Sequence, residues 1–160
     1  MTTTQDLKDL ALAAFRLIET GDHAEAARVV SPEFVNQEAE DDPEDIERQE
    51  HGPTGYLATG TWLRDSFSDL KFEIEEIAVD GDTVIAASIM SGQHTGTFQG
   101  IAPTGRHFTQ KQVHIFHTAG RQVVSHRAVR DDLGLLFQLG WTPNVRASCH
   151  PRRYQEPVRG

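Results

Sequence analysis

The sequence predicts an α+β domain in which N-terminal helices pack against one curved antiparallel sheet. Before Leu70, apolar residues recur every three or four positions, which is typical of amphipathic helices. From Leu70 onward they alternate with polar residues, as they do in half-buried strands. These strand-like runs follow one another with no βαβ alternation, which favours antiparallel pairing.

Two helices are predicted in the first 31 residues. The first carries one apolar stripe, formed by Leu7, Leu10, Ala11, Ala14, Phe15, Leu17 and Ile18. Asp22 and Glu25 have the spacing of a capping box, so they begin a short second helix. This helix turns Val29 and Val30 inward, and the Ser-Pro pair that follows ends it.

A third helix is predicted after Pro53 and Thr54. One face of this helix carries Tyr56, Gly60, Leu63 and Phe67. A glycine among larger apolar residues indicates that another backbone approaches closely, and we expect this at Gly60.

The first strand contains a change of phase that predicts curvature. Phe72 and Ile74 share one parity, whereas Ile77 and Val79 have the other. An extra residue near Glu75-Glu76 restores the alternation, so we expect a β-bulge there. A bulge bends its strand, and the sheet should curve strongly.

Further strands are predicted at residues 83–91, 94–99, 107–117 and 122–129. Asp80-Gly81 is a hairpin turn signal before the first of them. Leu133 to Leu139 forms a short closing helix, and Gly140 stops it. The predicted domain therefore covers residues 1–140. Residues 141–160, with three Pro and four Arg, are expected to form an extended tail or an arm that wraps a partner subunit.

Composition limits the classes of function. The chain of 160 residues is the size of one domain. Its net charge of −9 argues against nucleic-acid binding, because phosphates select a basic surface. Most of that charge lies between Gln37 and His51, where eight acidic residues and one basic residue predict a solvated loop. The alternatives are a lid over a pocket mouth or a rim that attracts cations.

The sequence also predicts a cytoplasmic location. Cys149 is the chain's one cysteine, and the N-terminus shows no secretory signal pattern. No apolar run approaches the roughly 20 residues needed to span a bilayer, so no membrane association is expected.

Two motif blocks flank the strand at residues 107–117 and point to a family. They are GQHTGTFQGIAPTGR, from Gly92 to Arg106, and SHRAVRDDLGLLFQLG, from Ser125 to Gly140. In this order they resemble the SnoaL-like polyketide cyclases, or ester cyclases, of the NTF2-like superfamily. The resemblance implies a cone-shaped α+β fold and a cyclase that performs an intramolecular aldol condensation without metal or cofactor.

Asp131 is the candidate general acid/base that the resemblance implies, since it follows HRxxx and precedes the closing helix. The alternative is that Asp131 serves only as the N-cap of this helix, a position that Asp favours. Asp132 weakens that alternative, because only one residue can be the N-cap.

The resemblance also pairs the carboxylate with a histidine from the preceding strand, where His114 and His117 are both candidates. Side chains three apart on a strand point to opposite faces, so at most one of them enters a cavity. If Ala119-Gly120 forms the turn, His114 faces the carboxylate. A shift of one residue favours His117.

Four further residues are candidates for substrate binding. Asn36 can orient a carbonyl, although many relatives have His at this place, and an amide can instead bond its own backbone. Phe34 and Trp62, with Phe67, are expected to form an apolar wall. His94 is a candidate through its motif, and its alternative is a structural role.

No metal site or cofactor is predicted, because GxGxxG, GxxxxGK[ST], CxxC, HExxH and GxSxG are all missing from the sequence. The expected ligand is a small polyketide-like substrate. Two alternatives stay open: a related isomerase, dehydratase or cofactor-free oxygenase, and a non-catalytic binding protein. A homodimer or higher homo-oligomer is expected, because a curved open sheet leaves a convex face to cover.

Overall fold

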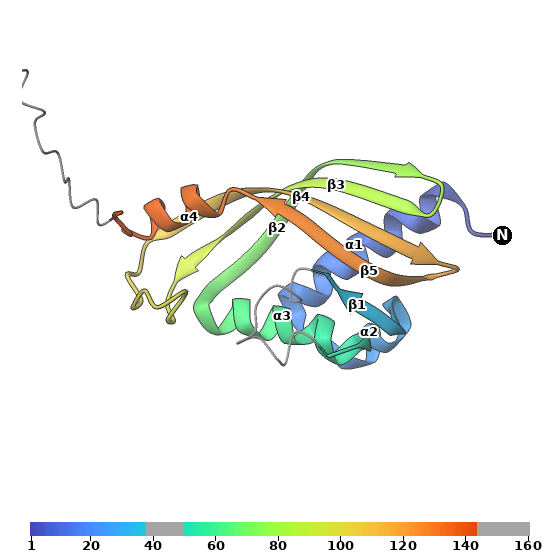
Figure 1. Ribbon diagram of the computed structural model, residues 1–160, viewed down its shortest axis with the longest axis horizontal. Helices are drawn as coiled ribbons and strands as arrows, with labels where there is room; N and C mark the ends of the chain where they lie inside the picture. The colour runs from blue at the N-terminus through green and yellow to red at the C-terminus, as the bar shows by residue number, and fades with distance from the viewer. Residues whose placement is uncertain (38–49, 144–160) are drawn as a thin grey trace, which may run out of the picture.

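The computed structural model describes residues 1–37 and 50–143. The elements follow in the order α1 (Thr4–Thr20), α2 (His23–Val29), β1 (Val30–Asn36), α3 (Gly52–Ser66), β2 (Phe67–Asp80), β3 (Thr83–His94), β4 (His107–Ala119), β5 (Gln122–Arg130) and α4 (Asp132–Gln138) (Figure 1). The acidic loop and almost all of the predicted tail lie outside the described residues. None of the helices in the described ranges is long and apolar enough to cross a membrane.

The five strands form one sheet in the order β1-β5-β4-β3-β2. The four long strands pair antiparallel, as predicted. The sequence did not predict β1, which extends one edge of this sheet by pairing with β5 in parallel. The second helix ends at Val29, so Val30 begins this edge strand instead of continuing the helix. An edge strand accepts Pro32, because the missing N–H is not needed on its open side.

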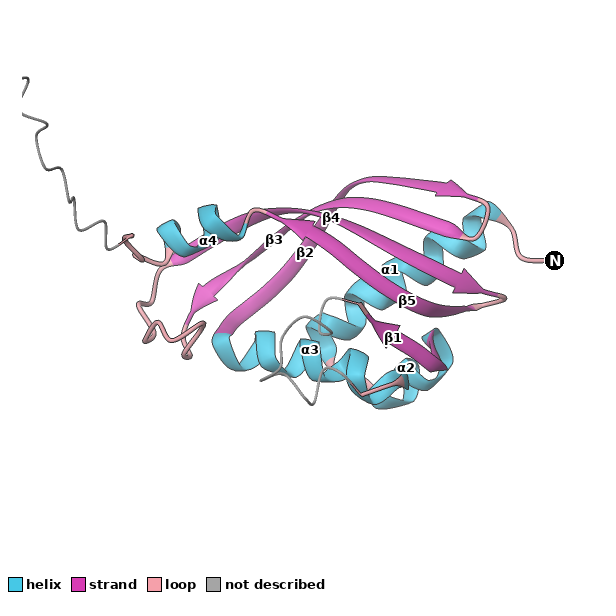
Figure 2. Cartoon of the chain, viewed as in Figure 1, coloured by secondary structure: helices cyan, strands magenta, loops and turns pink. Residues whose placement is uncertain are grey.

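Bulges bend the sheet over the helices, which pack on its concave side (Figure 2). The register of β2 against β3 shifts between Ile74 and Glu76, which confirms the predicted bulge. A second shift lies between His117 and Thr118 on β4. The confirmed curvature opens one end of the layer between sheet and helices, where a cavity can form.

The segment predicted as a strand at residues 94–99 is a loop. Strand β3 runs through His94, and the chain then turns away and returns at β4 with a short bridge between Phe98 and Ile101. A Cβ on Gly96 would lie 1.9 Å from the carbonyl oxygen of Asp65, so the loop presses against the end of α3. Gln99 and Gly100 adopt φ of 49° and 75°, which reverses the chain.

The core lies between α1 and the concave face. All seven residues of the predicted stripe on α1 are buried, which confirms that helix. A Cβ on Gly60 would lie 3.1 Å from the Ile18 backbone, which confirms the predicted close approach between α1 and α3. Phe34 is fully buried in this core, where its ring packs against Tyr56 with centroids 5.3 Å apart.

Candidate active site

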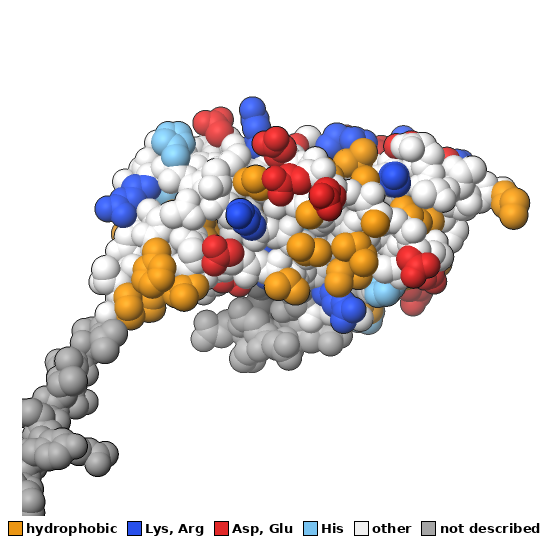
Figure 3. Space-filling view, turned by 90° about the horizontal axis from the view of Figure 1, so that it is seen from above, with side chains coloured by type: hydrophobic (Ala, Val, Ile, Leu, Met, Phe, Trp, Pro, Cys, Tyr) orange, Lys and Arg blue, Asp and Glu red, His pale blue; other side chains and the backbone are white. Residues whose placement is uncertain are grey.

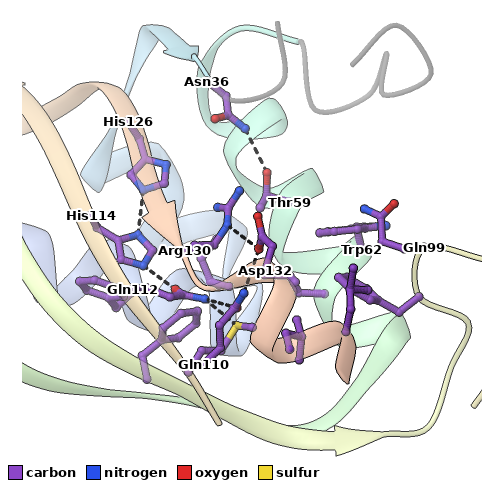
Figure 4. A pocket seen from close by; sticks show the side chains of 18 of the residues that line it. Asn36, Thr59, Trp62, Gln99, Gln110, Gln112, His114, His126, Arg130 and Asp132 are labelled. Atoms are coloured by element: carbon purple, nitrogen blue, oxygen red, sulfur yellow. Dashed lines mark hydrogen bonds and ion pairs between the residues drawn. The ribbon is translucent and has the colours of Figure 1, made fainter. Parts of the chain in front are cut away.

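A cavity of about 460 Å³ opens between the sheet and α1, α3 and α4 (Figure 4). Its apolar wall is formed by Phe15, Ile18, Tyr56, Trp62, Leu63, Phe72, Met90, Phe98, Ile101, Leu135, Leu136 and Trp141. Its polar lining is formed by Asn36, Thr59, Gln99, Gln110, Gln112, His114, His126, Arg130 and Asp132. A mostly apolar hollow with a few convergent polar groups is the usual form of a small-molecule site.

The two adjacent aspartates at the start of α4 have different positions. Asp131 is the N-cap, and its Oδ1 accepts a hydrogen bond of 2.9 Å from the Gly134 backbone N–H. Its side chain is not part of the cavity lining, whereas that of Asp132 is. The structure therefore places Asp131 in the capping role that the sequence left as its alternative, and the carboxylate in the cavity belongs to Asp132.

Asp132 sits at the cavity margin, with its side chain 67% exposed. Gln110 Nε2 donates to its Oδ1 at 2.8 Å. Arg130 Nε lies 3.6 Å from the same oxygen. The site thus holds a carboxylate and a guanidinium side by side where a ligand can reach both.

A row of polar side chains continues from Asp132 along the inner face of β4 (Figure 4). Gln110, Gln112 and His114 alternate along the strand, so all three point inward. Gln112 Nε2 donates to Gln110 Oε1 at 2.7 Å, and Gln112 Oε1 lies 2.6 Å from His114 Nε2. The row ends on β5, where His126 Nε2 lies 2.9 Å from His114 Nδ1.

Both histidines of this row are neutral at physiological pH. Burial lowers the pKa of His126 to about 3, and the positive charge of Arg130 adds to this shift. Burial likewise holds the pKa of His114 well below its ordinary value, with smaller contributions from His126 and Arg130. Neutral imidazole both donates and accepts a hydrogen bond, so each ring has one nitrogen of each kind.

The other predicted site residues divide between the cavity and the scaffold. Asn36 and Trp62 line the cavity, and Asn36 Nδ2 donates to Thr59 Oγ1 at 3.2 Å. His117 points to the opposite face of β4 from His114, and its Nδ1 lies 3.2 Å from Thr83 Oγ1. Phe34 belongs to the core and is not part of the cavity lining.

His94 is also a scaffold residue. It is fully buried behind the lining, and its Nδ1 lies 3.0 Å from Thr104 Oγ1 and accepts from the Thr104 backbone N–H at 3.3 Å. These bonds tie the end of β3 to the loop that follows it, which is the structural role left open by the sequence.

Sequence reasoning missed Arg130 and His126 as site residues, although both lie in the HRxxxDD motif. His114 pairs with Ala128 across β4 and β5, so the even-numbered residues of β5 share its inward face. Trp141 was likewise assigned to the tail, yet it lines the cavity and its ring packs 5.8 Å from that of Phe137.

Comparison with known proteins identifies the family. The SnoaL-like polyketide cyclase family matches residues 8–139. The chain is 32% identical over 149 residues to the aklanonic acid methyl ester cyclase DauD of Streptomyces sp. (strain C5), covering 89% of each chain. This protein belongs to the SnoaL-like polyketide cyclase family. The match confirms the family, the fold class and the cyclase class of enzyme that the motifs predict.

Other relatives agree with this assignment. The nogalonic acid methyl ester cyclase of Streptomyces nogalater is 30% identical over 124 residues, covering 76% of this chain and 87% of the relative. Among solved structures, TsrD from Streptomyces laurentii has the same fold, with a TM-score of 0.75, 24% identity, and coverage of 88% of this chain and 98% of TsrD.

Proposed function

We propose that this cyclase closes a ring by a cofactor-independent intramolecular aldol condensation, with Asp132 as the acid/base. One observation carries the proposal: a carboxylate and a guanidinium lie 3.6 Å apart at the edge of an apolar cavity. A carbon flanked by two carbonyls gives a delocalised enolate, so the protein needs to supply only a base and a stabilising charge beside an apolar surface that holds the substrate.

One residue both removes and returns the proton that this reaction transfers. The Asp132 carboxylate takes a proton from the carbon between two carbonyls, leaving an enolate. The enolate carbon bonds to a ketone carbon of the same molecule, and that ketone oxygen becomes an alkoxide. Protonated Asp132 then returns its proton to the alkoxide, so the product is an isomer of the substrate.

Arg130 supplies the charge that this sequence of steps requires. Negative charge moves from the carboxylate to the enolate and then to the alkoxide, always within the same small region. A fixed guanidinium beside that region stabilises all three species, and most strongly those formed during the reaction. We assign Arg130 this electrostatic role.

His114 has a different role from the proton donor that the sequence suggested. Its Nε2 lies 2.6 Å from Gln112 Oε1 and its Nδ1 lies 2.9 Å from His126 Nε2. With both ring nitrogens engaged by protein groups, His114 is a positioning residue, and proton return falls to Asp132.

The relatives suggest the class of substrate. DauD and the Streptomyces nogalater protein act, by their names, on aklanonic acid methyl ester and nogalonic acid methyl ester. We propose that the substrate here is a methyl ester of a polyketide acid and that the enzyme acts in the cytoplasm. The aromatic wall formed by Trp62, Phe72 and Phe98 suits a flat molecule of this kind.

The direct test is conversion of such an ester to a product of equal mass with one ketone fewer. We expect turnover to survive exhaustive chelation, because the two flanking carbonyls already acidify the carbon and the sequence has no metal-ligand spacing. Loss of activity in EDTA that a divalent ion restores would refute the metal-free mechanism.

We also propose that two copies pair through the convex face of the sheet. Hydrophobic side chains are exposed among charged ones on the face seen in Figure 3. By strand register, Ile85, Val113 and Val129 lie on the face opposite to His114, and they are 42%, 39% and 72% exposed. Val113 and Val129 belong to one line of paired residues that crosses the sheet, and Glu76 is the β2 member of this line. In the adjacent line of paired residues on this face, Arg127 is the β5 member. A two-fold axis through the apolar centre brings the acidic edge of one copy to the basic edge of the other.

Light scattering at micromolar concentration is expected to give a dimer mass. Val129→Asp introduces a charge at the centre of the apolar row, so it should produce monomers without loss of fold. A monomer mass for the unaltered protein would overturn the pairing.

A further inference from the structure

The polar row consists of Asp132, Gln110, Gln112, His114 and His126. The hydrogen bonds along it all have the same donor-to-acceptor direction, which the Asp132 carboxylate determines. An ionised carboxylate only accepts hydrogen bonds, so Gln110 must turn its NH₂ group toward Asp132. The Gln110 carbonyl oxygen then accepts from the NH₂ group of Gln112. This leaves the Gln112 carbonyl oxygen facing His114 Nε2, which must therefore carry the hydrogen.

The same direction continues to His126. Neutral His114 with hydrogen on Nε2 has only a lone pair on Nδ1, so it accepts from His126 Nε2–H. His126 Nδ1 is then an acceptor, and among the hydrogen bonds of the described residues it has no partner. The ring lines the cavity and is partly exposed there.

We propose that His126 Nδ1 binds a hydroxyl group of the substrate, an enol or a phenol, and that Gln110 and Gln112 are positioning residues that fix this acceptor. A carbonyl or ether oxygen cannot take this place, because two acceptors facing each other repel. The proposal rests on the proposed function, since it names the chemistry of the substrate far from its reacting carbon.

Burial and the charge of Arg130 keep the acceptor available. They hold the pKa of His126 at about 3, so the Nδ1 lone pair is not protonated at neutral pH. Other charged groups near the ring do not reverse this, since Asp132 is separated from it by Gln110, Gln112 and His114.

The position of His126 also indicates the length of the substrate. His126 pairs with Asn36 on β1, whereas Arg130 lies four residues further along β5. Four residues of strand span about 13 Å. A molecule that offers a hydroxyl to His126 while its reacting carbon lies beside Arg130 and Asp132 must therefore be of comparable length.

Binding of simple probes tests the acceptor without turnover. Calorimetry with 2-naphthol, naphthalene and 2-methoxynaphthalene should give the unaltered protein roughly tenfold higher affinity for the naphthol, the value of one good hydrogen bond. In His126→Phe this preference should disappear. In His126→Gln it should persist, since a glutamine amide can still donate to His114 and accept from the ligand.

Two further measurements keep the proposal falsifiable if His126→Phe does not fold. Gln112→Met should reduce the naphthol preference, whereas Gln93→Met should not, because Gln93 is not part of the cavity lining and donates to the Gly105 carbonyl oxygen. In ¹⁵N spectra of the unaltered protein both His114 and His126 should carry hydrogen on Nε2, with His94 as an internal standard of the same form. Hydrogen on His126 Nδ1, or an unchanged preference in His126→Phe, would overturn the proposal while leaving the aldol mechanism standing.

Discussion

Asp132→Asn is expected to lower kcat/KM by roughly 10²-fold to 10⁴-fold while the protein stays folded, which is the usual cost of removing a positioned general base. Asparagine keeps the size of the side chain and can still accept from Gln110, so the polar row is disturbed little. It cannot take a proton from carbon. The measurement is steady-state turnover of a polyketide methyl ester, together with a thermal melt.

Asp131→Asn is the matched control, one residue away on the same turn. Asparagine caps a helix about as well as aspartate, so both stability and turnover should change little. Equal losses in the two variants would mean that the site responds to general disturbance of α4. If only Asp131→Asn lost activity, the acid/base role would return to Asp131, where the sequence motifs first put it.

The two aspartates show what the sequence could and could not decide. Two consecutive acids before a helical run predict that one caps the helix and that the other is available for chemistry. Which one caps depends on where the backbone leaves the extended conformation of β5. That point depends on the hydrogen bond from Gln110, which lies 22 residues before Asp132, and on the register of β5 against β4.

The choice between His114 and His117 was undecidable for a related reason. Strand β4 carries apolar residues of both parities, with Phe116 on one face and Val113 on the other, so its alternation does not mark the inner side. Opposite His117 and Thr118, strand β5 has one extra, unpaired residue, because Thr118 pairs with Val123 and His117 pairs with Ser125. A shift by one residue exchanges the two faces of the strand, so it places His126 beside His114. Nothing in the local sequence predicts this shift.

Features that depend on neighbours in the chain were predictable. The stripe on α1 and the close approach at Gly60 follow from local spacing, and the bulge in β2 shows as a change of apolar parity. Strand β1 was missed because seven residues with a proline at the third position carry little alternation, and its parallel partner β5 lies more than 80 residues later.

Arg130→Gln is expected to lower kcat by roughly 10²-fold to 10³-fold, the range seen when one stabilising group is removed from a developing oxyanion. KM should change much less, because the guanidinium acts mainly on charge that appears after binding. The variant has a second signature. The charge of Arg130 contributes to the low pKa of His126, so that pKa should rise in Arg130→Gln, while burial still keeps it below its ordinary value.

Arg127→Gln is the control for charge alone. Arg127 lies on the same strand but pairs with Ile115, so its side chain points to the convex face. The Arg127→Gln variant should therefore leave kcat and the pKa of His126 unchanged. Arg130→Lys restores a positive charge without the planar geometry of guanidinium, so it should recover part of the rate. Full activity in Arg130→Gln, or an equal loss in Arg127→Gln, would show that the reaction proceeds without a cation fixed beside Asp132.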